Sequence, residues 1–358
     1  MARRRPMRGK HNPMDAGASE EPVFGFMISR EPLIFWGPSN PPYPAALGTT
    51  LASRIGNRRA WFLISLSYTR EIDPTLQADL EHFAELRARY PEHRHVVLCN
   101  TPQELERFGK AGQPAVVCSA NVFVDESVFD IPPSEPKVYD AIYNAALAPY
   151  KRHELCTGID RLALIYHRFA DLVADRPAYP DEVHGMLSKA DFLNESNGEY
   201  RNLSSGDIVR YLGRSHVGLC LSQMEGQMRA CVEYLLCGLP VVTTPNVGGR
   251  NRQLDPAYSI MADPTPEAIA RAVDALKVKN LDPHFVRRAV MSRLKPDRMR
   301  LLQLIAAIYR EESIPFPADA DWIQLFRRGT FPRKTPDGLF AEQAVAETRI
   351  AGGGPDQQ

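Results

Sequence analysis

The segment of this chain that gives the clearest indication of function contains two glutamates with seven residues between them. Glu225 follows the apolar run at 217–221, and Glu233 lies in an apolar segment that ends at a Gly-Leu-Pro sequence, before a second apolar run. On a helix this spacing separates the carboxylates by roughly two turns, so the two glutamates do not share a proton. A fixed acceptor at each end suits an elongated ligand rich in hydroxyl groups.

The elements that must position this pair are a strand, a loop, a helix and a second strand. We expect strands at 217–221 and 241–244, with a helix at 228–237 between them. Open α/β sheets bind ligands beyond the carboxyl ends of their strands, where a helix begins. The first turn of that helix offers unpaired N–H groups to an anion.

This segment resembles the Glu-x7-Glu motif of retaining glycosyltransferases of family 4, the glycosyl transferases group 1, which have the GT-B fold. The sequence Cys-Gly-Leu-Pro-Val-Val-Thr-Thr-Pro-Asn-Val-Gly-Gly at 237–249 is similar to the same pattern. The resemblance implies that Glu225 holds the donor sugar and that Glu233 accepts the ribose hydroxyls of the nucleotide. It also implies that three backbone amides help to hold the donor: those of Gly226, Gln227 and Met228.

The family holds the donor diphosphate with an arginine and, after four further residues, a lysine. Lys151 matches the lysine, whereas Ala146 stands in the arginine position. The missing arginine removes about 1.5–3 kcal/mol of charge-assisted bonding. Because a lysine beside the diphosphate stabilises the charge of the leaving group, the resemblance implies that Lys151 acts in catalysis with Glu225. Asn144 and Arg152 are further candidates for donor binding, and a solvated helix start is the alternative for residues 151–153.

Composition indicates a globular protein with two domains. The chain has 358 residues, of which 44% are hydrophobic and 24% charged, and its formal net charge of +0 gives no electrostatic case for nucleic acid. No apolar run is long enough to span a bilayer, and no apolar segment follows the basic N-terminus as a secretory signal requires. Six cysteines without a Cys-x-x-Cys pair indicate reduced thiols in a cytoplasmic protein.

Short apolar strand patterns alternate with helical patterns, which indicates parallel α/β units. We expect a short acceptor-side domain at 21–130, a proline-rich linker at 131–136 and a nucleotide-sugar-binding domain at 137–314. Residues 1–20 are expected to form a disordered tail, and residues 315–358 a C-terminal extension with a flexible tail. The resemblance implies a GT-B fold, in which two Rossmann-like domains with parallel sheets face each other across a cleft.

The remaining elements expected from the pattern are strands at 23–28, 61–66, 95–98, 115–118, 138–143, 162–166 and 259–261. Helices are expected at 74–90, 103–110, 181–188, 206–213, 266–277 and 298–311, together with a helix after Lys151. Thr101 before Pro102 is typical of a helix start. The apolar face of 298–311 favours packing inside the protein, with a weak peripheral membrane contact as the alternative.

Other constellations carry less weight. Asp319 and Asp321 have the Asp-x-Asp form of metal-dependent glycosyltransferases, but they lie outside the nucleotide domain. His93 and His95 have no carboxylate or cysteine spaced to complete a metal site. The sequence also lacks the glycine-rich phosphate loops of dinucleotide enzymes and P-loop hydrolases. We therefore expect neither a metal nor a cofactor.

The resemblance implies a metal-independent hexosyltransferase that moves a sugar from a UDP- or GDP-type donor to an acceptor hydroxyl with retention of configuration. A glycan or a lipid-linked molecule is the expected acceptor, in polysaccharide or glycoconjugate biosynthesis. The alternative is a non-catalytic GT-B protein that binds a nucleotide sugar or a partner glycosyltransferase, which Ala146 and the short first domain support. A sugar-nucleotide epimerase of similar fold is a second rival, but no acid–base cluster supports it.

Overall fold

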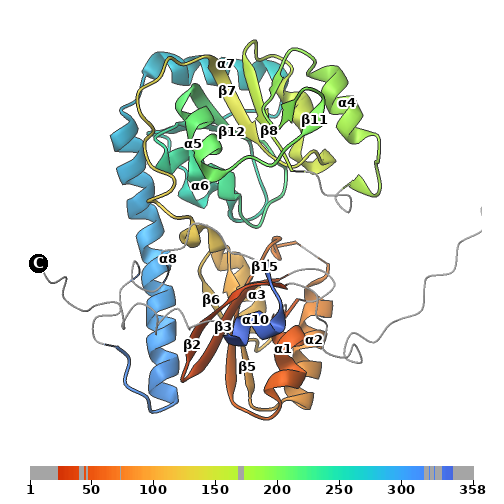
Figure 1. Cartoon of the computed structure of the whole chain (residues 1–358), viewed down its shortest axis with the longest axis vertical. Helices are drawn as coiled ribbons and strands as arrows, with labels where there is room; N and C mark the ends of the chain where they lie inside the picture. The colour runs from red at the N-terminus through yellow and green to blue at the C-terminus, as the bar shows by residue number, and fades with distance from the viewer. Residues whose placement is uncertain are drawn as a thin grey trace, which may run out of the picture.

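The computed structural model contains two α/β domains stacked along the long axis of the molecule, with one long helix beside both (Figure 1). It describes residues 23–39, 44–45, 47–72, 74–167, 173–317, 322, 326 and 333–341. Of the two predicted tails, residues 1–20 lie outside the described residues. Within 315–358 the structure describes 315–317, 322, 326 and 333–341, and the last of these ranges contains β15 and α10. Asp319 and Asp321 also lie outside them.

The first domain is built on a five-stranded sheet in the order β2-β3-β4-β5-β6, parallel except for the pair β2–β3. Its strands are Phe26–Arg30, Leu33–Pro38, Ala60–Ser65, His93–Cys99 and Ala115–Val117. Its helices are α1 (Leu47–Ile55), α2 (Leu76–Arg89) and α3 (Pro102–Lys110), followed by the 3₁₀ turn η1 (Ala120–Phe123). The chain returns to this domain at its end, where β15 (Arg333–Lys334) pairs with β1 (Val23–Phe24) and α10 (Pro336–Ala341) lies nearby.

The second domain is built on a fully parallel six-stranded sheet in the order β14-β13-β12-β7-β8-β9. In chain order its strands are Tyr139–Asn144, Leu162–Ile165, Asp191–Phe192, Ser215–Cys220, Val241–Thr243 and Ser259–Met261. Its helices are α4 (Tyr179–Met186), α5 (Ser205–Gly213), α6 (Arg229–Leu236) and α7 (Pro266–Lys279), with a small hairpin, β10 (Glu195–Ser196) and β11 (Glu199–Tyr200). The α/β class and the parallel sheets predicted from the sequence are confirmed.

Strand β3 and helix α1 of the first domain were not predicted, and neither were η1, β15 and α10. In β3 the apolar run ends in Gly37 and Pro38, which favour a loop, yet the strand pairs in parallel with β4 up to Pro38. In α1, Gly48 is a poor helix former. A side chain there would bring its Cβ within 2.8 Å of Nε2 of His95, so close packing of the helix on β5 explains the glycine.

The prediction of a helix after Lys151 is wrong. The chain there forms two 3₁₀ turns, η2 (Pro149–Lys151) and η3 (His153–Cys156). Arg152 joins them with φ of 57°, a left-handed conformation that interrupts a right-handed helix. The phenol of Tyr143 donates a 2.7 Å hydrogen bond to the carbonyl of Lys151 and fixes the first turn.

Helix α8 (Pro283–Glu311) begins well before the predicted start at residue 298 and continues through Pro296. Asp282 caps it by accepting hydrogen bonds from the N–H groups of His284 and Phe285, a start signal that sequence reasoning missed. A proline inside a helix removes one backbone hydrogen bond. Burial of one helix face on both sides of Pro296 offsets this loss; the buried apolar residues are Val286, Val290, Leu294, Leu301, Ile305 and Ile308.

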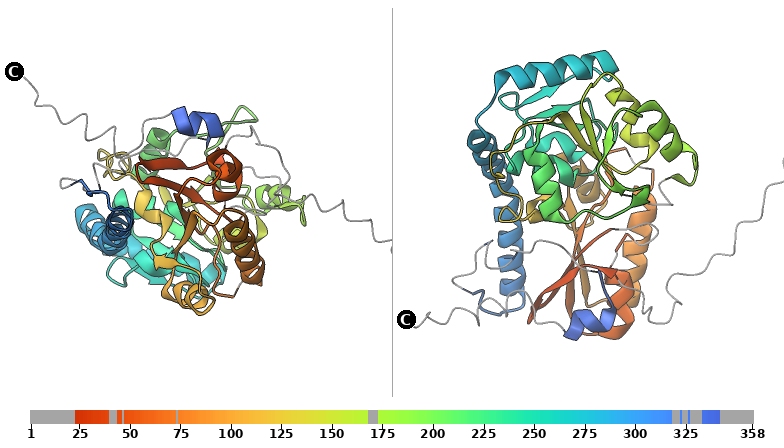
Figure 2. Two further views of the ribbon diagram at one scale, coloured as in Figure 1. Left: turned by 90° about the horizontal axis from the view of Figure 1, so that it is seen from below. Right: turned by 45° about the horizontal axis from the view of Figure 1, so that its top comes forward.

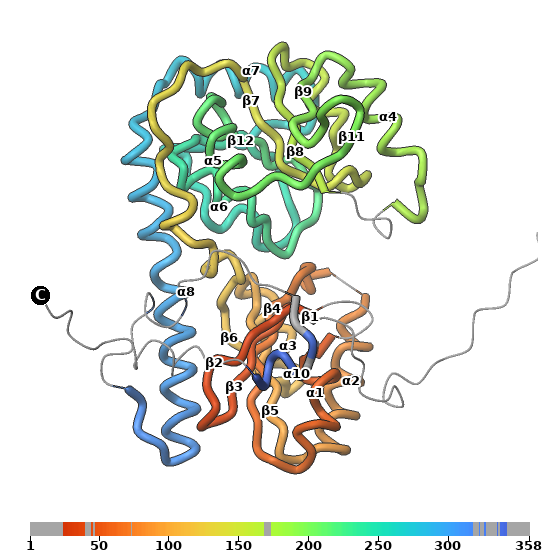
Figure 3. Tube along the Cα trace, viewed as in Figure 1, coloured from red at the N-terminus to blue at the C-terminus, as the bar shows by residue number. Residues whose placement is uncertain are grey.

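Helix α8 joins the two domains into one body (Figures 2 and 3). One apolar core extends from a face of the first sheet through η1 and α8 into the second domain, and a smaller core covers the other face of the first sheet. At the end of α8, Tyr309 and Ser29 share a 2.8 Å hydrogen bond, and Glu312 accepts from Nε1 of Trp61 at 2.8 Å. The last turns of α8 therefore pack on the first domain, although the sequence assigned them to the second.

No described helix is long and apolar enough to cross a membrane. All six cysteines are buried free thiols.

Buried His95 makes the stability of the first domain depend on pH. Its ring stacks on Phe62 with centroids 5.2 Å apart, and neither ring nitrogen finds a hydrogen-bond partner among the described residues. Burial lowers the pKa of His95 to about 3. Because the unfolded state binds a proton below about pH 6.5, stability that is complete above that pH is lost as the pH falls toward 3, at about 1.4 kcal/mol per pH unit.

Replacing the imidazole by an apolar side chain, His95→Leu, should therefore flatten the pH dependence of stability. Urea unfolding at pH 7.5 and pH 5 measures the effect. We expect the wild type to lose about 2 kcal/mol more than the variant over this interval. Burial also lowers the pKa of His153, in the second domain, to about 3. His153 is present in both proteins, so its contribution cancels in the comparison. Parallel losses in the two proteins would show that His95 is not the titrating group.

Candidate functional site

A cavity of about 520 Å³ lies beyond the carboxyl ends of β7 and β12, beside the start of α6. The second domain provides most of its wall, and Ser67 and Tyr68 belong to the first domain. The cavity brings together six of the eight residues predicted from the sequence: Asn144, Lys151, Glu225, Gln227, Met228 and Glu233. Ala146 also lines it, so the position without the arginine faces the same space.

Lys151 and Glu225 form a buried ion pair between Nζ and Oε1, with side chains that are 10% and 9% exposed. The loop of Glu225 is fixed by its own N–H, which donates to the carbonyl of Val247 at 3.0 Å. The ammonium of Lys151 also lies 4.9 Å from the ring centroid of Tyr150. Burial and the negative charge of Glu225 raise the pKa of Tyr68, so the first domain places a phenol close to this carboxylate.

Glu233 forms a second carboxylate–cation pair one helical turn from the start of α6. Nε of Arg229 donates to Oε1 of Glu233 at 2.8 Å, and the side chains are 41% and 7% exposed. Burial raises the pKa of the Glu233 carboxyl, and the charge and hydrogen bond of Arg229 oppose that rise. Arg229 lines the cavity but was missed in the sequence; its position four residues before Glu233, on the same helix face, was the available signal.

The start of α6 presents backbone donors to the cavity. Its N-cap is Met228, whose thioether is a poor acceptor for the first amides of the helix. Such unpaired N–H groups, aided by the helix dipole, attract an anion. Met228 and Arg229 line the cavity, so this helix start lies at the place where the sequence predicted an anion.

Arg152 does not line the cavity. Its Nε donates to the carbonyl of Leu221 at 2.7 Å, and its Nη2 donates to Oγ1 of Thr244 at 2.6 Å. Arg250 is also buried and donates to the carbonyls of Ser222 and Thr244. Both guanidinium groups thus hold the loops after β12 and β13, and the position of Arg152 gives no support to its predicted role in donor binding.

Gly226 lies at a close contact between the domains rather than on the cavity wall. A Cβ at this position would lie 2.8 Å from both Nδ2 of Asn100 and the carbonyl carbon of Tyr68. On the other side, Gly248 has φ of 102°, and a Cβ there would lie 2.1 Å from the carbonyl oxygen of Glu225. The loop at 225–228 is therefore held between the first domain and the loop of Gly248.

A buried carboxylate fixes the first-domain side of this contact. Glu104 accepts hydrogen bonds from the N–H groups of Arg70 at 2.7 Å and Asn100 at 2.6 Å. Burial raises the pKa of Glu104, and these two hydrogen bonds oppose the rise. Thr101 accepts from the N–H of Glu104, which confirms it as the predicted helix cap. Glu104 thereby holds together the two loops that meet Gly226.

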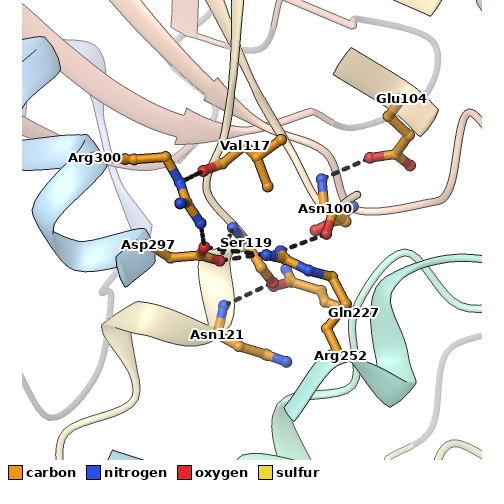
Figure 4. Close-up of polar contacts among 9 residues, drawn as sticks. All are labelled: Asn100, Glu104, Val117, Ser119, Asn121, Gln227, Arg252, Asp297 and Arg300. Atoms are coloured by element: carbon orange, nitrogen blue, oxygen red, sulfur yellow. Dashed lines mark hydrogen bonds and ion pairs between the residues drawn. The ribbon is translucent and has the colours of Figure 1, made fainter. Parts of the chain in front are cut away.

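A polar cluster around Asp297 of α8 links the same loops (Figure 4). The buried Asp297 carboxylate accepts from both terminal nitrogens of Arg252, at 3.0 and 3.1 Å, and from the N–H of Ser119 at 3.3 Å. Arg252 also donates to the carbonyl of Asn100 at 2.6 Å. Ser119 in turn donates to Oε1 of Gln227 at 3.3 Å, so Gln227, predicted from the sequence, is tied to the first domain.

Several residues on the cavity wall carried no motif in the sequence. Among them are Ser67, Tyr68, Tyr150, His167, Ser205 and Ile208. Burial lowers the pKa of His167. These residues come from separate loops, from the turn η2 and from helix α5, and only the fold brings them together.

In the part of the chain that the structure describes, no three His, Cys, Asp or Glu side chains are grouped to hold a metal ion.

Residues 187–289 match the family model described as Glycosyl transferases group 1. The matched segment contains Glu225 and Glu233, together with β12, α6 and β13. The predicted resemblance to glycosyl transferases group 1 is confirmed for this part of the second domain. No curated protein matches the chain.

Solved glycosyltransferases share the fold of the chain. A glycosyltransferase from Rickettsia africae ESF-5 is 15% identical with a TM-score of 0.54, covering 78% of this chain and 76% of its own. Trehalose-6-phosphate synthase OtsA is 14% identical with a TM-score of 0.53, covering 79% and 72%. Sucrose-phosphate synthase from Thermosynechococcus elongatus is 14% identical with a TM-score of 0.52, covering 74% and 72%. The predicted GT-B fold is confirmed.

A side chain at Gly226 should disturb the contact between the domains. In Gly226→Ala the added Cβ must displace Tyr68 or Asn100, and we expect faster amide hydrogen exchange in 225–233 and a stability loss of about 1–3 kcal/mol. Gly185→Ala is the control, because no atom lies within 4 Å of a Cβ on this α4 glycine. Unchanged exchange and stability in Gly226→Ala would show that the loop does not depend on this contact.

Proposed function

From a chain with the GT-B fold and a second domain of the glycosyl transferases group 1 family, we propose a retaining hexosyltransferase that uses a UDP- or GDP-type sugar donor. The observation that carries the proposal is the cavity at the start of α6, where Lys151, Glu225 and Glu233 meet. The cavity provides positive charge for a diphosphate and carboxylates for hydroxyl groups within one enclosed space.

The diphosphate lies, in this proposal, between Lys151 and the first turn of α6. Lys151 is the first phosphate ligand in this proposal. Its ammonium is nearly buried and already pairs with an anionic group, the carboxylate of Glu225. Charge on the leaving diphosphate grows as the glycosidic bond breaks, so a fixed cation stabilises the transition state more than the ground state. Lys151 therefore acts in catalysis, and the positive charge requires no bound metal ion.

The two carboxylates divide the remainder of the donor between them. Glu233 accepts the ribose hydroxyls, and Glu225 holds the donor sugar. Gln227, Met228 and Asn144 complete the walls around the donor. In this scheme Glu225 positions the sugar and does not attack it.

The acceptor hydroxyl enters from the first-domain side, where Ser67 and Tyr68 line the cavity. A glycan and a lipid-linked molecule remain the two candidate acceptors, and a role in polysaccharide or glycoconjugate biosynthesis follows from either. A cytoplasmic location is part of the same proposal.

A non-catalytic GT-B protein that binds a nucleotide sugar or a partner glycosyltransferase is the second candidate. Ala146 favours it, because the cavity wall at this position carries no cation where the family resemblance implies an arginine. A non-catalytic protein that binds a nucleotide sugar shares donor binding with the first candidate and lacks its turnover, whereas one that binds only a partner glycosyltransferase lacks both.

A panel of nucleotide sugars, tested with a chelator present, separates these candidates. Thermal shift measures binding, and release of the nucleoside diphosphate measures turnover. We expect at least one UDP- or GDP-sugar to stabilise the protein and to be hydrolysed at an unchanged rate in the chelator. Stabilisation without hydrolysis or transfer would support the non-catalytic candidate. Activity that is lost in the chelator and restored by Mn²⁺ would contradict the metal-independent mechanism.

Truncating each glutamate should affect different parts of the donor. Glu233→Ala removes the acceptor for the ribose hydroxyls and should weaken the nucleoside diphosphate at least tenfold in calorimetry. Glu225→Ala should change nucleoside diphosphate affinity less than threefold and abolish the additional affinity that the sugar provides. Equal losses of the diphosphate and the sugar nucleotide in both variants would contradict this division.

A further inference from the structure

Four basic side chains surround the cavity, but they are available to a ligand to different degrees. Arg152 and Arg250 are engaged with backbone carbonyls of the loops after β12 and β13. Lys151 and Arg229 line the cavity, and each is paired with a carboxylate that also lines it. Lys151 and Arg229 are therefore the two basic side chains of the cavity wall that an anionic ligand can reach.

Arg229 is placed to change partners. Arg229 is the first residue of α6 and directly follows the N-cap Met228. It therefore lies at the end of the helix that attracts anions. Its side chain is 41% exposed and lines the cavity, whereas that of Glu233 is 7% exposed. The pair is an i,i+4 contact within α6, with the exposed partner on the cavity side of a buried carboxylate.

We propose that Arg229 is the second diphosphate-binding cation of this site, and that it leaves Glu233 for the phosphate oxygens when the nucleotide binds. The inference rests on the proposed function, since it assigns a residue to the donor diphosphate. It explains how the site keeps two cations although Ala146 carries none. It also releases Glu233 at the moment when the ribose hydroxyls arrive to donate to it.

The exchange gives each charged group of the two ion pairs a new partner. Two carboxylates and two cations line it before binding, and the ligand adds a diphosphate together with hydroxyl donors. The cations turn to the phosphate oxygens, and hydroxyl groups replace them at Glu225 and Glu233. A planar guanidinium grips two phosphate oxygens at once, which the ammonium of Lys151 cannot do.

Calorimetry on Arg229→Gln tests this role, because glutamine can still donate to Glu233 but carries no charge. The probes are UDP, GDP and pyrophosphate, with uridine and guanosine as ligands without phosphate. We expect about tenfold weaker binding of the diphosphates and less than threefold change for the nucleoside. Arg293→Gln is the matched control: this arginine is 38% exposed and is paired with Asp255 in the same domain.

Restoring a cation at the other wall position provides a second test. Ala146→Arg should tighten diphosphate binding about tenfold in the wild type and should recover most of the affinity lost in Arg229→Gln. This rescue does not depend on the helix contact between Arg229 and Glu233, so it distinguishes a phosphate ligand from a residue that only stabilises α6.

Three outcomes would overturn the assignment of Arg229: equal weakening of diphosphate and nucleoside, unchanged diphosphate affinity, and no rescue by Ala146→Arg in a folded double variant. Binding of pyrophosphate but of no nucleotide by the wild type would refute the nucleotide-sugar proposal alone, and Arg229→Gln would still test the anion site. A wild type that binds none of these diphosphates would refute both.

Discussion

Two buried carboxylates that lack a solvent shell are the constraint on which this site depends. Glu225 and Glu233 are both nearly inaccessible, and a buried carboxylate is strongly destabilising unless a cation or hydrogen-bond donors surround it. The fold provides one cation for each carboxylate: Lys151 pairs with Glu225, and Arg229 pairs with Glu233. A ligand that separates these ion pairs must therefore supply new partners for both the carboxylates and the cations. Hydroxyl groups can take the place of the cations at the carboxylates, and an anion can take the place of the carboxylates at the cations. A nucleoside diphosphate sugar carries both kinds of group at different points along its length, as the cavity carries Glu225 on a loop and Glu233 on α6.

The geometry of the loop at 225–228 depends on the first domain although its residues belong to the second. Gly226 has no room for a side chain against Tyr68 and Asn100, and Gln227 accepts a hydrogen bond from Ser119. Asp297, buried in the middle of α8, joins Ser119 and Arg252 and so couples the long helix to the loops on both sides. The continuous apolar core through η1 and α8 holds this arrangement in place. The donor site and the orientation of the domains are thus parts of one packed contact.

The sequence predicted the parts of the site whose signal is local. A strand, a loop and a helix in immediate succession placed Glu225 and Glu233, and Lys151 followed from the family resemblance, whose lysine it matches. Arg152 and Arg229 show the limit of such reasoning. The left-handed backbone at Arg152 turns its side chain toward Leu221 and Thr244, a direction that tertiary packing decides. Arg229 had the right spacing to Glu233, but helix pairs of this kind are common on surfaces and only the cavity distinguishes it. Only the second half of α8 was predicted for the same reason. The burial that stabilises the helix on both sides of Pro296 involves residues from both domains.

A crystal structure of the protein with a bound nucleoside diphosphate, UDP or GDP, tests the central claim most directly. The account predicts the diphosphate between Lys151 and the first turn of α6, the ribose hydroxyls at Glu233, and the guanidinium of Arg229 turned from Glu233 to the phosphate. A nucleotide bound elsewhere on the protein, or a cavity in which both carboxylate–cation pairs stay closed at saturating nucleotide, would contradict it.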